Sequence, residues 1–317
     1  MDPRPLPVGA FTLLGFVVLG TLASTGCATT SISSSVVTTT SATEQPALSG
    51  DADTQSGTQS DTQSGSEIAA PAAEGEPEVP PEPPATTVPP LDRETLEVAA
   101  LDAPIPPIGT ASGPDAARLQ QRLLDLGYWV QATDGEYELT TNQAVMAFQK
   151  YEGLQPTGSL DAATATRISS AGIRPYGRAQ AGTMVEIDKA KQLLFIVEEG
   201  RTRWVLNAST GSEIAYSEPN SNDPEVIEEG DSVTPVGLHN VNREREEGWW
   251  EGDLGQIYRP KYFRGGVAVH GANTVPEYPA SHGCVRVSVP AMDWIWDQGL
   301  LPIGSLVWVH GEIPERT

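Results

Sequence analysis

The chain has 317 residues, which is enough for two folded domains and additional connecting sequence. Its 42 acidic side chains outnumber its 19 lysines and arginines, and the formal net charge is −23 at pH 7. This balance argues against nucleic acid as a partner and against attachment to anionic lipid through a basic surface, because both need clustered Lys and Arg.

Residues 1–27 have the pattern of an export signal. Arg4 precedes an apolar run over residues 8–22, which is shorter than the ~20 residues of a spanning helix and ends in small residues. Gly26 and Cys27, which follow, resemble the lipobox of bacterial lipoproteins, in which the cysteine is lipidated. We expect an extracytoplasmic protein held to the membrane through Cys27, with plain secretion or an uncleaved signal anchor as alternatives.

Cys27 and Cys284 are the two cysteines of the chain. If Cys27 is lipidated or removed with the signal, Cys284 has no partner within the molecule. An unpaired cysteine in an exported protein is either a reactive thiol or part of an intermolecular bridge. Cys284 is therefore a candidate functional residue on counting alone.

Residues 28–112 are rich in Ser, Thr, Pro, Ala, Gly and acidic side chains, with a short repeat that begins at Asp51. Such a segment cannot bury enough apolar surface to offset its chain entropy, so we expect disorder. Its proline-rich part, 80–90, is expected to be extended. The segment is interpreted as a linker across the space between membrane and wall.

Residues 113–172 contain apolar side chains at helical spacing, with glycines that end helices. The pattern predicts three short helices, which is a minimal bundle. The predicted limits are Pro114 to Gly127, Thr141 as N-cap to Gly153, and a third helix that begins at Asp161.

This segment resembles the peptidoglycan-binding domain that accompanies many wall enzymes. One departure is Glu138, where the family usually has a glycine. The resemblance implies wall binding, and Tyr128 and Trp129 are expected to be exposed and to stack on sugar rings; a helical spacer is the alternative. The matching motifs are Leu119-Gln120-Gln121-Arg122-Leu123, Leu126-Gly127-Tyr128, Asp134-Gly135, Ala144-Val145-x-x-Phe148-Gln149 and Gly153-Leu154.

From Thr183 onward apolar residues alternate with their neighbours, and Glu199-Gly200 is a candidate hairpin turn. Many short strands with Gly, Pro and Asn between them predict a mainly β sandwich or barrel over 180–311. One helix is expected after Ser288, with Gly299 beyond its end. Further strands are expected at 202–207, 236–241, 266–270 and 306–310.

The residues with chemical potential lie within one short stretch. A thiol of pKa ~8.5 is mostly protonated at neutral pH, so a nucleophilic Cys284 needs a neighbouring base, and an imidazole suits this task. On the expected strand 266–270, His270 lies on the face opposite Val267 and Val269. The stretch comprises His270-Gly271 and Ser281-His282-Gly283-Cys284-Val285-Arg286.

Gly283 is expected to allow close approach of a substrate, and main-chain N–H groups beside it to form an oxyanion hole. Two alternatives remain from the residues alone. Cys284, His270 and His282 could be three zinc ligands. Cys284 could also be a buried, inert cysteine.

At these residues the chain resembles the L,D-transpeptidase family, also known by its YkuD-type catalytic domain. The similarity extends to Thr234-Pro235-x-Gly237, Tyr262-Phe263 and Gly304. It implies that Cys284 is the nucleophile and His270 the base.

The same resemblance implies supporting roles for the neighbours of these two residues. The carbonyl of Gly271 would orient the His270 ring, and Ser281 would brace the loop. His282 would shape the site and bind substrate. Arg286 would either pair with a substrate carboxylate or support the loop.

The implied reaction is the formation of 3→3 cross-links in peptidoglycan through a thioester, without metal or cofactor. A cysteine carboxypeptidase and a non-catalytic wall-binding protein are the alternatives. Two acidic segments, Ser212–Thr234 and Glu244–Glu251 with Trp249 and Trp250, are expected to attract the ammonium group of the acceptor, unless they are only solvated surface.

Overall fold

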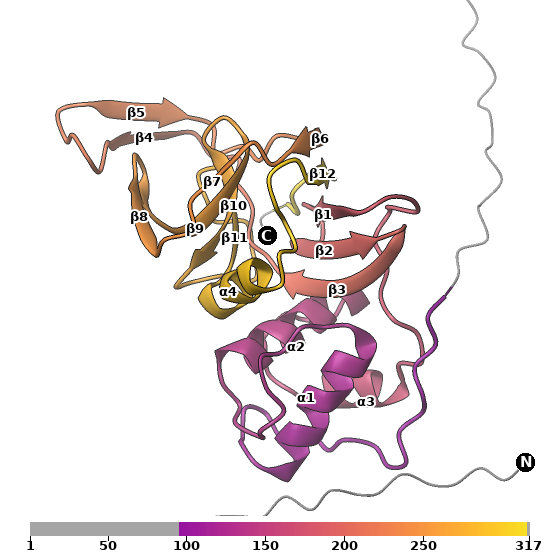
Figure 1. Cartoon of the computed structure of the whole chain (residues 1–317). Coiled ribbons are helices and arrows are strands. Elements are labelled where there is room, and N and C mark those ends of the chain that lie inside the picture. The colour runs from indigo at the N-terminus through magenta and orange to yellow at the C-terminus, as the bar shows by residue number, and fades with distance from the viewer. Residues whose placement is uncertain (1–94, 316–317) are drawn as a thin grey trace, which may run out of the picture. The chain divides into compact units, whose positions relative to one another are not determined.

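The computed structural model describes residues 95–315, which form four helices and twelve strands (Figure 1). The expected signal peptide, Cys27 and residues 28–94 of the expected linker lie outside the described residues. The expectation of disorder is wrong for residues 95–112, which pack on the helical segment. Ile105 has an exposed fraction of 3%, and Val98 N donates to Gly172 O at 2.8 Å. Among residues 95–315, no helix has the length and apolar run that crossing a bilayer requires.

Three helices lie in the segment where the sequence predicts them. Gly127 and Gly153 end the first two in the left-handed conformation, and the carboxylate of Asp161 caps the third by accepting from Thr164 N at 2.7 Å. The prediction of Thr141 as an N-cap is wrong, because the second helix begins two residues earlier and Thr141 is buried inside it. The helices are α1 (Pro114–Leu126), α2 (Leu139–Glu152) and α3 (Ala162–Ser170).

Polar residues of the helical motifs are buried and hold loops rather than facing solvent. The Gln120 side chain accepts from Gly135 N at 2.8 Å and donates to Thr141 Oγ1 at 2.9 Å. Gln149 accepts from Gly158 N at 2.8 Å. These amides replace water for groups that would otherwise be buried without partners, so they are structural residues.

The first sheet has the strand order β3-β2-β1-β12-β6, with β1 parallel to β12 and the other neighbours antiparallel. The predicted hairpin turn between β2 and β3 is confirmed: Glu199 and Gly200 both have positive φ, 51° and 78°. The strands are β1 (Met184–Asp188), β2 (Leu193–Glu198), β3 (Arg201–Asn207), β6 (Gly237–Asn240) and β12 (Leu306–His310).

Strand β2 is buried on both faces, so the expected alternation of buried and exposed positions is wrong here. Leu193, Phe195 and Val197 pack into the core of the helical segment. Leu194 and Ile196 point the other way, into the core shared with the second sheet. A continuous apolar run is the pattern of a strand that is covered on both faces.

Tyr128 and Trp129 are not exposed, and this corrects the expectation that they stack on sugars. Their exposed fractions are 1% and 7%. The chain after α1 runs beside β3, where Trp129 N donates to Val205 O at 3.3 Å and Val205 N to Gly127 O at 2.8 Å. This pairing directs both rings inward, and Trp129 packs on Trp294 with ring centroids 5.2 Å apart.

The second sheet has the order β11-β10-β9-β7, and β8 also pairs with β9. Helix α4 packs against it through the fully buried Met292 and Ile295, and Ser288 is its N-cap as predicted, accepting from Ala291 N at 3.4 Å. The elements are β7 (Arg243–Glu244), β8 (Trp249–Gly252), β9 (Gly255–Arg264), β10 (Val267–Ala272), β11 (Val285–Ser288) and α4 (Val289–Asp297).

A separate hairpin, β4 (Tyr216–Pro219) with β5 (Ile227–Gly230), projects from the body on the side away from α1–α3 (Figure 1). Neither this hairpin nor β7–β9 is predicted from the sequence. Their strands are charged or exposed on at least one face, so they carry little of the apolar alternation that identifies strands.

The double burial of β2 predicts that the helices and the sheets unfold together. Phe195→Ala on one face and Ile196→Ala on the other should each lower the free energy of unfolding by about 2–5 kcal/mol. In each variant, tryptophan fluorescence and helical circular dichroism should report one coincident urea transition. The exposed Ile303→Ala is the control. A transition in which Phe195→Ala melts the helices alone would contradict this account.

Candidate active site

A pocket of about 300 Å³ opens beside the ends of β10 and β11. It combines residues that are far apart in sequence, from the β4–β5 hairpin, the β8–β9 turn and the His270 to Arg286 stretch. Its lining consists of Tyr216, Glu228, Gly252, Asp253, Leu254, Gly255, Gln256, Ile257, Gly266, Val267, His270, Ser281, His282, Cys284 and Arg286.

The pairing of β10 with β11 places the side chains of His270, Cys284 and Arg286 on one face. The strands are parallel, with Val269 opposite Val285 and His270 opposite Arg286. Paired residues share a face and successive residues alternate, so both valines point into the core while His270 and Arg286 point to the pocket. Cys284 lies two residues before Arg286 and lines the same pocket.

His270 is buried, with an exposed fraction of 3%, and its ring is fixed by its own neighbour. Its Nδ1 lies 2.8 Å from the carbonyl oxygen of Gly271, the contact that the family resemblance implies. When Nδ1–H donates to that oxygen, Nε2 is the unprotonated nitrogen. Burial lowers the pKa of His270 to about 4, opposed by the Gly271 hydrogen bond and reinforced by the charge of Arg286.

Gly271 is a glycine for reasons of packing. A Cβ on it would lie 2.9 Å from the ring of Tyr258 and 3.1 Å from Cβ of Met292. The close approach of these two side chains fixes the backbone whose carbonyl contacts His270. Gly271 therefore contributes to the site through its main chain.

Cys284 is the free cysteine of the described residues, and it is half-buried. Its Sγ lies 3.7 Å from the carbonyl oxygen of Gly266. Burial raises the pKa of the Cys284 thiol, while a hydrogen bond from the Ala268 main chain and the charge of Arg286 act in the opposite direction. The resting pair is thus a neutral thiol and a neutral imidazole.

The loop before Cys284 is braced from within and from behind. Ser281 Oγ donates to the carbonyl oxygen of Cys284 and accepts from Gly283 N. Thr234 Oγ1 accepts from Gly211 N at 2.8 Å and donates to Gly283 O at 2.7 Å. The Gly283 N–H is therefore hydrogen-bonded to Ser281 in this structure, and an oxyanion hole of main-chain N–H groups in this loop stays a prediction.

The need for glycine at position 283 arises from the protein itself, and close approach of a substrate there stays a prediction. Its φ is +132°, a conformation that favours glycine, and a Cβ would lie 2.8 Å from Val233 O. The loop can therefore take this path only with glycine at this position.

His282 lies at the mouth of the pocket beside the β4–β5 hairpin. Its ring packs edge-on against Tyr216 with centroids 4.8 Å apart, and Nε2 is 3.4 Å from Glu218 Oε1.

Within residues 95–315 no group of three His, Cys, Asp or Glu side chains is arranged to hold a metal ion. This arrangement gives no support to the zinc alternative.

Arg286 contributes a positive charge to the pocket that no carboxylate of residues 95–315 neutralises in an ion pair. Its main chain pairs with Ser209, with N–H···O distances of 3.1 and 2.9 Å, which anchors the residue. An unpaired, half-buried guanidinium is suited to bidentate recognition of a carboxylate.

The two acidic segments differ in their relation to the pocket. Glu228 of the β4–β5 hairpin and Asp253 of the β8–β9 turn line it. No residue of 244–251 does, and Glu244 is paired with Lys261 at 2.8 Å. Residues 244–251 therefore add no charge to the lining of the pocket itself.

Several lining residues are missing from the set that sequence spacing identifies. Glu228 belongs to the acidic segment Ser212–Thr234 that is expected to attract the acceptor. Tyr216 and the Gly252–Ile257 turn reach the pocket through strands that the sequence does not predict. The turn signal in Gly252-Asp253-Leu254-Gly255 is visible in the sequence, but nothing local connects it to Cys284.

The lowered pKa of His270 predicts a dependence of stability on pH. Between pH 6.5 and about 4, the unfolded chain binds a proton at His270 that the native protein does not. Stability therefore falls as pH falls through this window, by up to about 3 kcal/mol. Urea unfolding of His270→Asn should lose that part of the slope, whereas His282→Asn should keep it. Parallel curves for wild type and His270→Asn would contradict the assignment.

Comparisons with known proteins agree with this geometry. Residues 182–309 match the L,D-transpeptidase catalytic domain family (YkuD), and residues 112–168 match the family of putative peptidoglycan binding domains. No curated protein matches the chain.

Solved structures with similar folds include an L,D-transpeptidase from Stackebrandtia nassauensis (23% identity, TM-score 0.36, covering 64% of this chain and 94% of that one). The L,D-transpeptidase of Xylanimonas cellulosilytica is 42% identical with a TM-score of 0.58, and the match covers 67% of this chain and 100% of that one. On this similarity, which spans the helical and catalytic segments, the chain belongs to the L,D-transpeptidase family.

Proposed function

We propose that this protein forms 3→3 cross-links in peptidoglycan through a thioester on Cys284. The observation that carries the proposal is the convergence of Cys284, His270 and the unpaired Arg286 on one pocket. Membership of the L,D-transpeptidase family supports a peptidoglycan-modifying enzyme at the cell wall, and the pocket supports the finer chemistry.

In the first half of the reaction the thiol of Cys284 attacks the carbonyl carbon between the third residue of a stem and its terminal D-alanine. His270 Nε2 takes the thiol proton as the C–S bond forms, since Nδ1 is held by Gly271 O. His270 then gives this proton to the departing amine of D-alanine as the C–N bond breaks. The product is a thioester.

The shifted pKa values favour proton transfer that is coupled to attack. Burial disfavours both the thiolate and the imidazolium, so a resting ion pair is unfavourable. His270 is neutral at physiological pH and is ready to accept a proton. The positive charge of Arg286 stabilises thiolate character at the moment of attack.

In the second half an amine on the third residue of another stem attacks the thioester carbon. His270 removes a proton from this amine and returns one to the sulfur as the C–S bond breaks. The balance is one amide broken, one amide formed, and a free D-alanine. Water in place of the amine would give the carboxypeptidase reaction.

The supporting residues have distinct proposed roles. Arg286 binds a carboxylate of the donor stem, because its guanidinium is unpaired within residues 95–315 and lines the pocket. His282 and Tyr216 shape the mouth of the pocket. Ser281 positions Gly283 and Cys284 through its hydroxyl.

The helical segment is proposed to bind peptidoglycan, as its family match suggests. Its buried Tyr128 and Trp129 take no part in that binding. The limits 113–172 and 180–311 for the two domains remain our proposal. Lipidation of Cys27 stays a prediction about residues outside the described range.

The nucleophile is tested by acylation with a carbapenem, a β-lactam whose carbonyl carbon a thiolate attacks. Cys284→Ala should form no covalent adduct in intact mass spectrometry. His270→Ala should acylate about 10²–10⁴-fold more slowly, because the general base is lost. His282→Ala is the matched control and should be the milder change. An adduct on Cys284→Ala, or a larger loss in His282→Ala, would contradict the assigned roles.

Transfer and hydrolysis are separated by product analysis with stem tetrapeptides. With acceptor stems at millimolar concentration, cross-linked dimer should exceed tripeptide. Removing both pocket charges, Glu228→Gln with Asp253→Asn, should lower the ratio of dimer to tripeptide by about tenfold, because acidic walls concentrate the acceptor ammonium.

The control for this experiment is Glu246→Gln with Glu247→Gln, which removes two exposed charges that do not line the pocket. This variant should keep the wild-type ratio. If tripeptide dominates at every acceptor concentration, the protein is a carboxypeptidase. If both double variants behave alike, the pocket acids do not attract the acceptor.

A further inference from the structure

The last turns of α2 contact the segment Asn207–Ser212, here called the bridging segment, which follows β3. Lys150 Nζ donates to Asn207 Oδ1 at 2.5 Å, Ala208 O at 3.1 Å and Gln192 O at 3.2 Å. In its ammonium form Lys150 has three N–H donors, and this environment satisfies all of them. One lysine of the helical segment thus holds the β1–β2 turn and the bridging segment together. Burial lowers the pKa of Lys150 to about 7.

A second side chain of α2 reaches the loop between the two motifs of the active site. Gln143 Oε1 accepts from Asn207 Nδ2 at 2.7 Å. Gln143 Nε2 and Asn207 Nδ2 both donate to Val275 O, each at 3.3 Å. Val275 belongs to the loop between the His270 strand and Cys284, here called the nucleophile loop. Helix α2 therefore contacts this loop directly.

The other end of the bridging segment holds the residues that flank Cys284. Thr210 O accepts from Ala280 N and from Ser281 N, both at 3.0 Å. Ser212 N donates to Ser281 O at 3.0 Å. Through these bonds and the Ser209–Arg286 pair, the bridging segment contacts the chain on both sides of Cys284.

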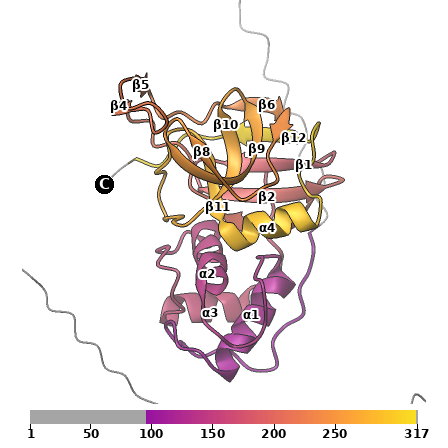
Figure 2. The same cartoon turned by 60° about the vertical axis from the view of Figure 1, so that its left-hand side comes forward.

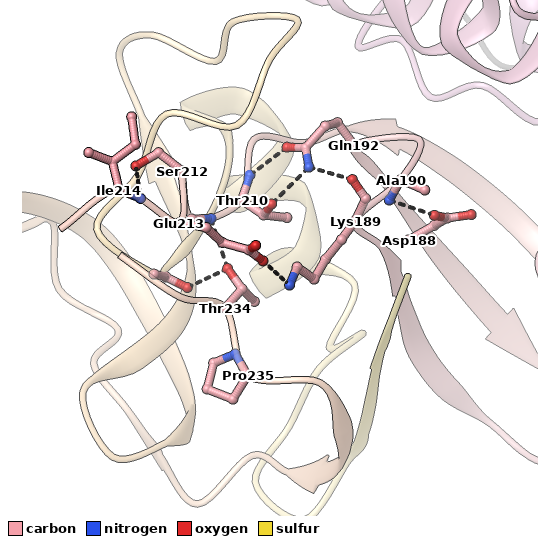
Figure 3. Close-up of polar contacts among 12 residues, drawn as sticks. Asp188, Lys189, Ala190, Gln192, Thr210, Ser212, Glu213, Ile214, Thr234 and Pro235 are labelled. Atoms are coloured by element: carbon pink, nitrogen blue, oxygen red, sulfur yellow. Dashed lines mark hydrogen bonds and ion pairs between the residues drawn. The ribbon is translucent and has the colours of Figure 1, made fainter. Parts of the chain in front are cut away.

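Figure 3 shows the contacts around Thr210, in the second half of the bridging segment. The fully buried Gln192 donates from Nε2 to Thr210 Oγ1 and accepts from Thr210 N at Oε1, both at 2.8 Å. Lys189 pairs with Glu213 just beyond the segment. Gln192 is also the residue whose carbonyl accepts from Lys150, so the contacts are continuous from α2 to Ser281.

Burial makes the loss of any of these hydrogen bonds energetically costly. Asn207, Ala208, Ser209 and Thr210 are all buried, so water cannot replace a lost partner at low cost. Leaving a buried polar group unpaired costs about 1–3 kcal/mol. When a substitution removes one of these partners, we expect the segment to move so that the group finds another. A displacement of the reacting group by about 1 Å can lower a rate by ~10².

We propose that Lys150 and Gln143 of the helical segment are positioning residues for the nucleophile loop, acting through Asn207, Gln192 and Thr210. The helical segment then positions the loop that carries Cys284, in addition to being a candidate wall-binding domain. The inference rests on the proposed role of Cys284.

The experiment uses the whole chain and two variants. Lys150→Met keeps the apolar stem and removes the donors. Asn207→Asp keeps an acceptor for Lys150 but removes the donors to Gln143 and Val275. Lys191→Met, an exposed lysine in the β1–β2 turn, is the matched control. The readouts are the maximal rate of carbapenem acylation, the concentration for half-maximal rate, and amide hydrogen exchange.

Both variants should remain folded by circular dichroism and lose about 10- to 100-fold in maximal acylation rate, with little change in half-maximal concentration. The amides of Ala280 and Ser281 should exchange faster than in Lys191→Met. A merely structural lysine would lower the melting temperature without either effect.

Wild-type acylation rates in both folded variants, with faster exchange confined to α2, would overturn the inference. If wild type itself is not acylated, the proposed function fails instead. In that case, exchange at Ala280 and Ser281 still decides whether α2 holds the nucleophile loop.

Discussion

Strand β2 of the first sheet is buried on both faces, and the positions of the elements around it follow from this constraint. Odd-numbered side chains of β2 pack on the helices, and even-numbered ones pack against the second sheet. In Figure 2 helices α1–α3 lie below β2 and α4, and β9 and β10 lie above β2. Because both coverings bury the same strand, displacing either would expose apolar surface at ~25 cal/mol per Å².

The active site places a neutral thiol, Cys284, and a neutral imidazole, His270, in one pocket. Burial lowers the pKa of His270 and raises that of Cys284, so neither charged form is favoured before substrate binds. The unpaired Arg286 supplies a compensating charge on the same face. The arrangement favours charge development during attack rather than at rest, which is the condition for transition-state stabilisation.

The sequence predicts the helices, the central strands and the reactive residues, because each is marked by local spacing. Cys284 is identified by counting cysteines, and His270 by its alternation with Val267 and Val269. The burial of Tyr128 and Trp129 and the contribution of the Gly252–Ile257 turn to the pocket could not be predicted. The first depends on pairing with Val205, and the second on the order of β8, β9, β10 and β11 in the second sheet.

The most direct test of the proposed chemistry is to trap the natural acyl-enzyme. The protein is mixed with a stem tetrapeptide, quenched in acid within milliseconds to seconds, digested and mapped by mass spectrometry. The account predicts the mass of the tripeptide acyl group on the peptide that contains Cys284, with one D-alanine released per adduct. Cross-linked product with no adduct at any quench time, or an adduct on another residue, would contradict it.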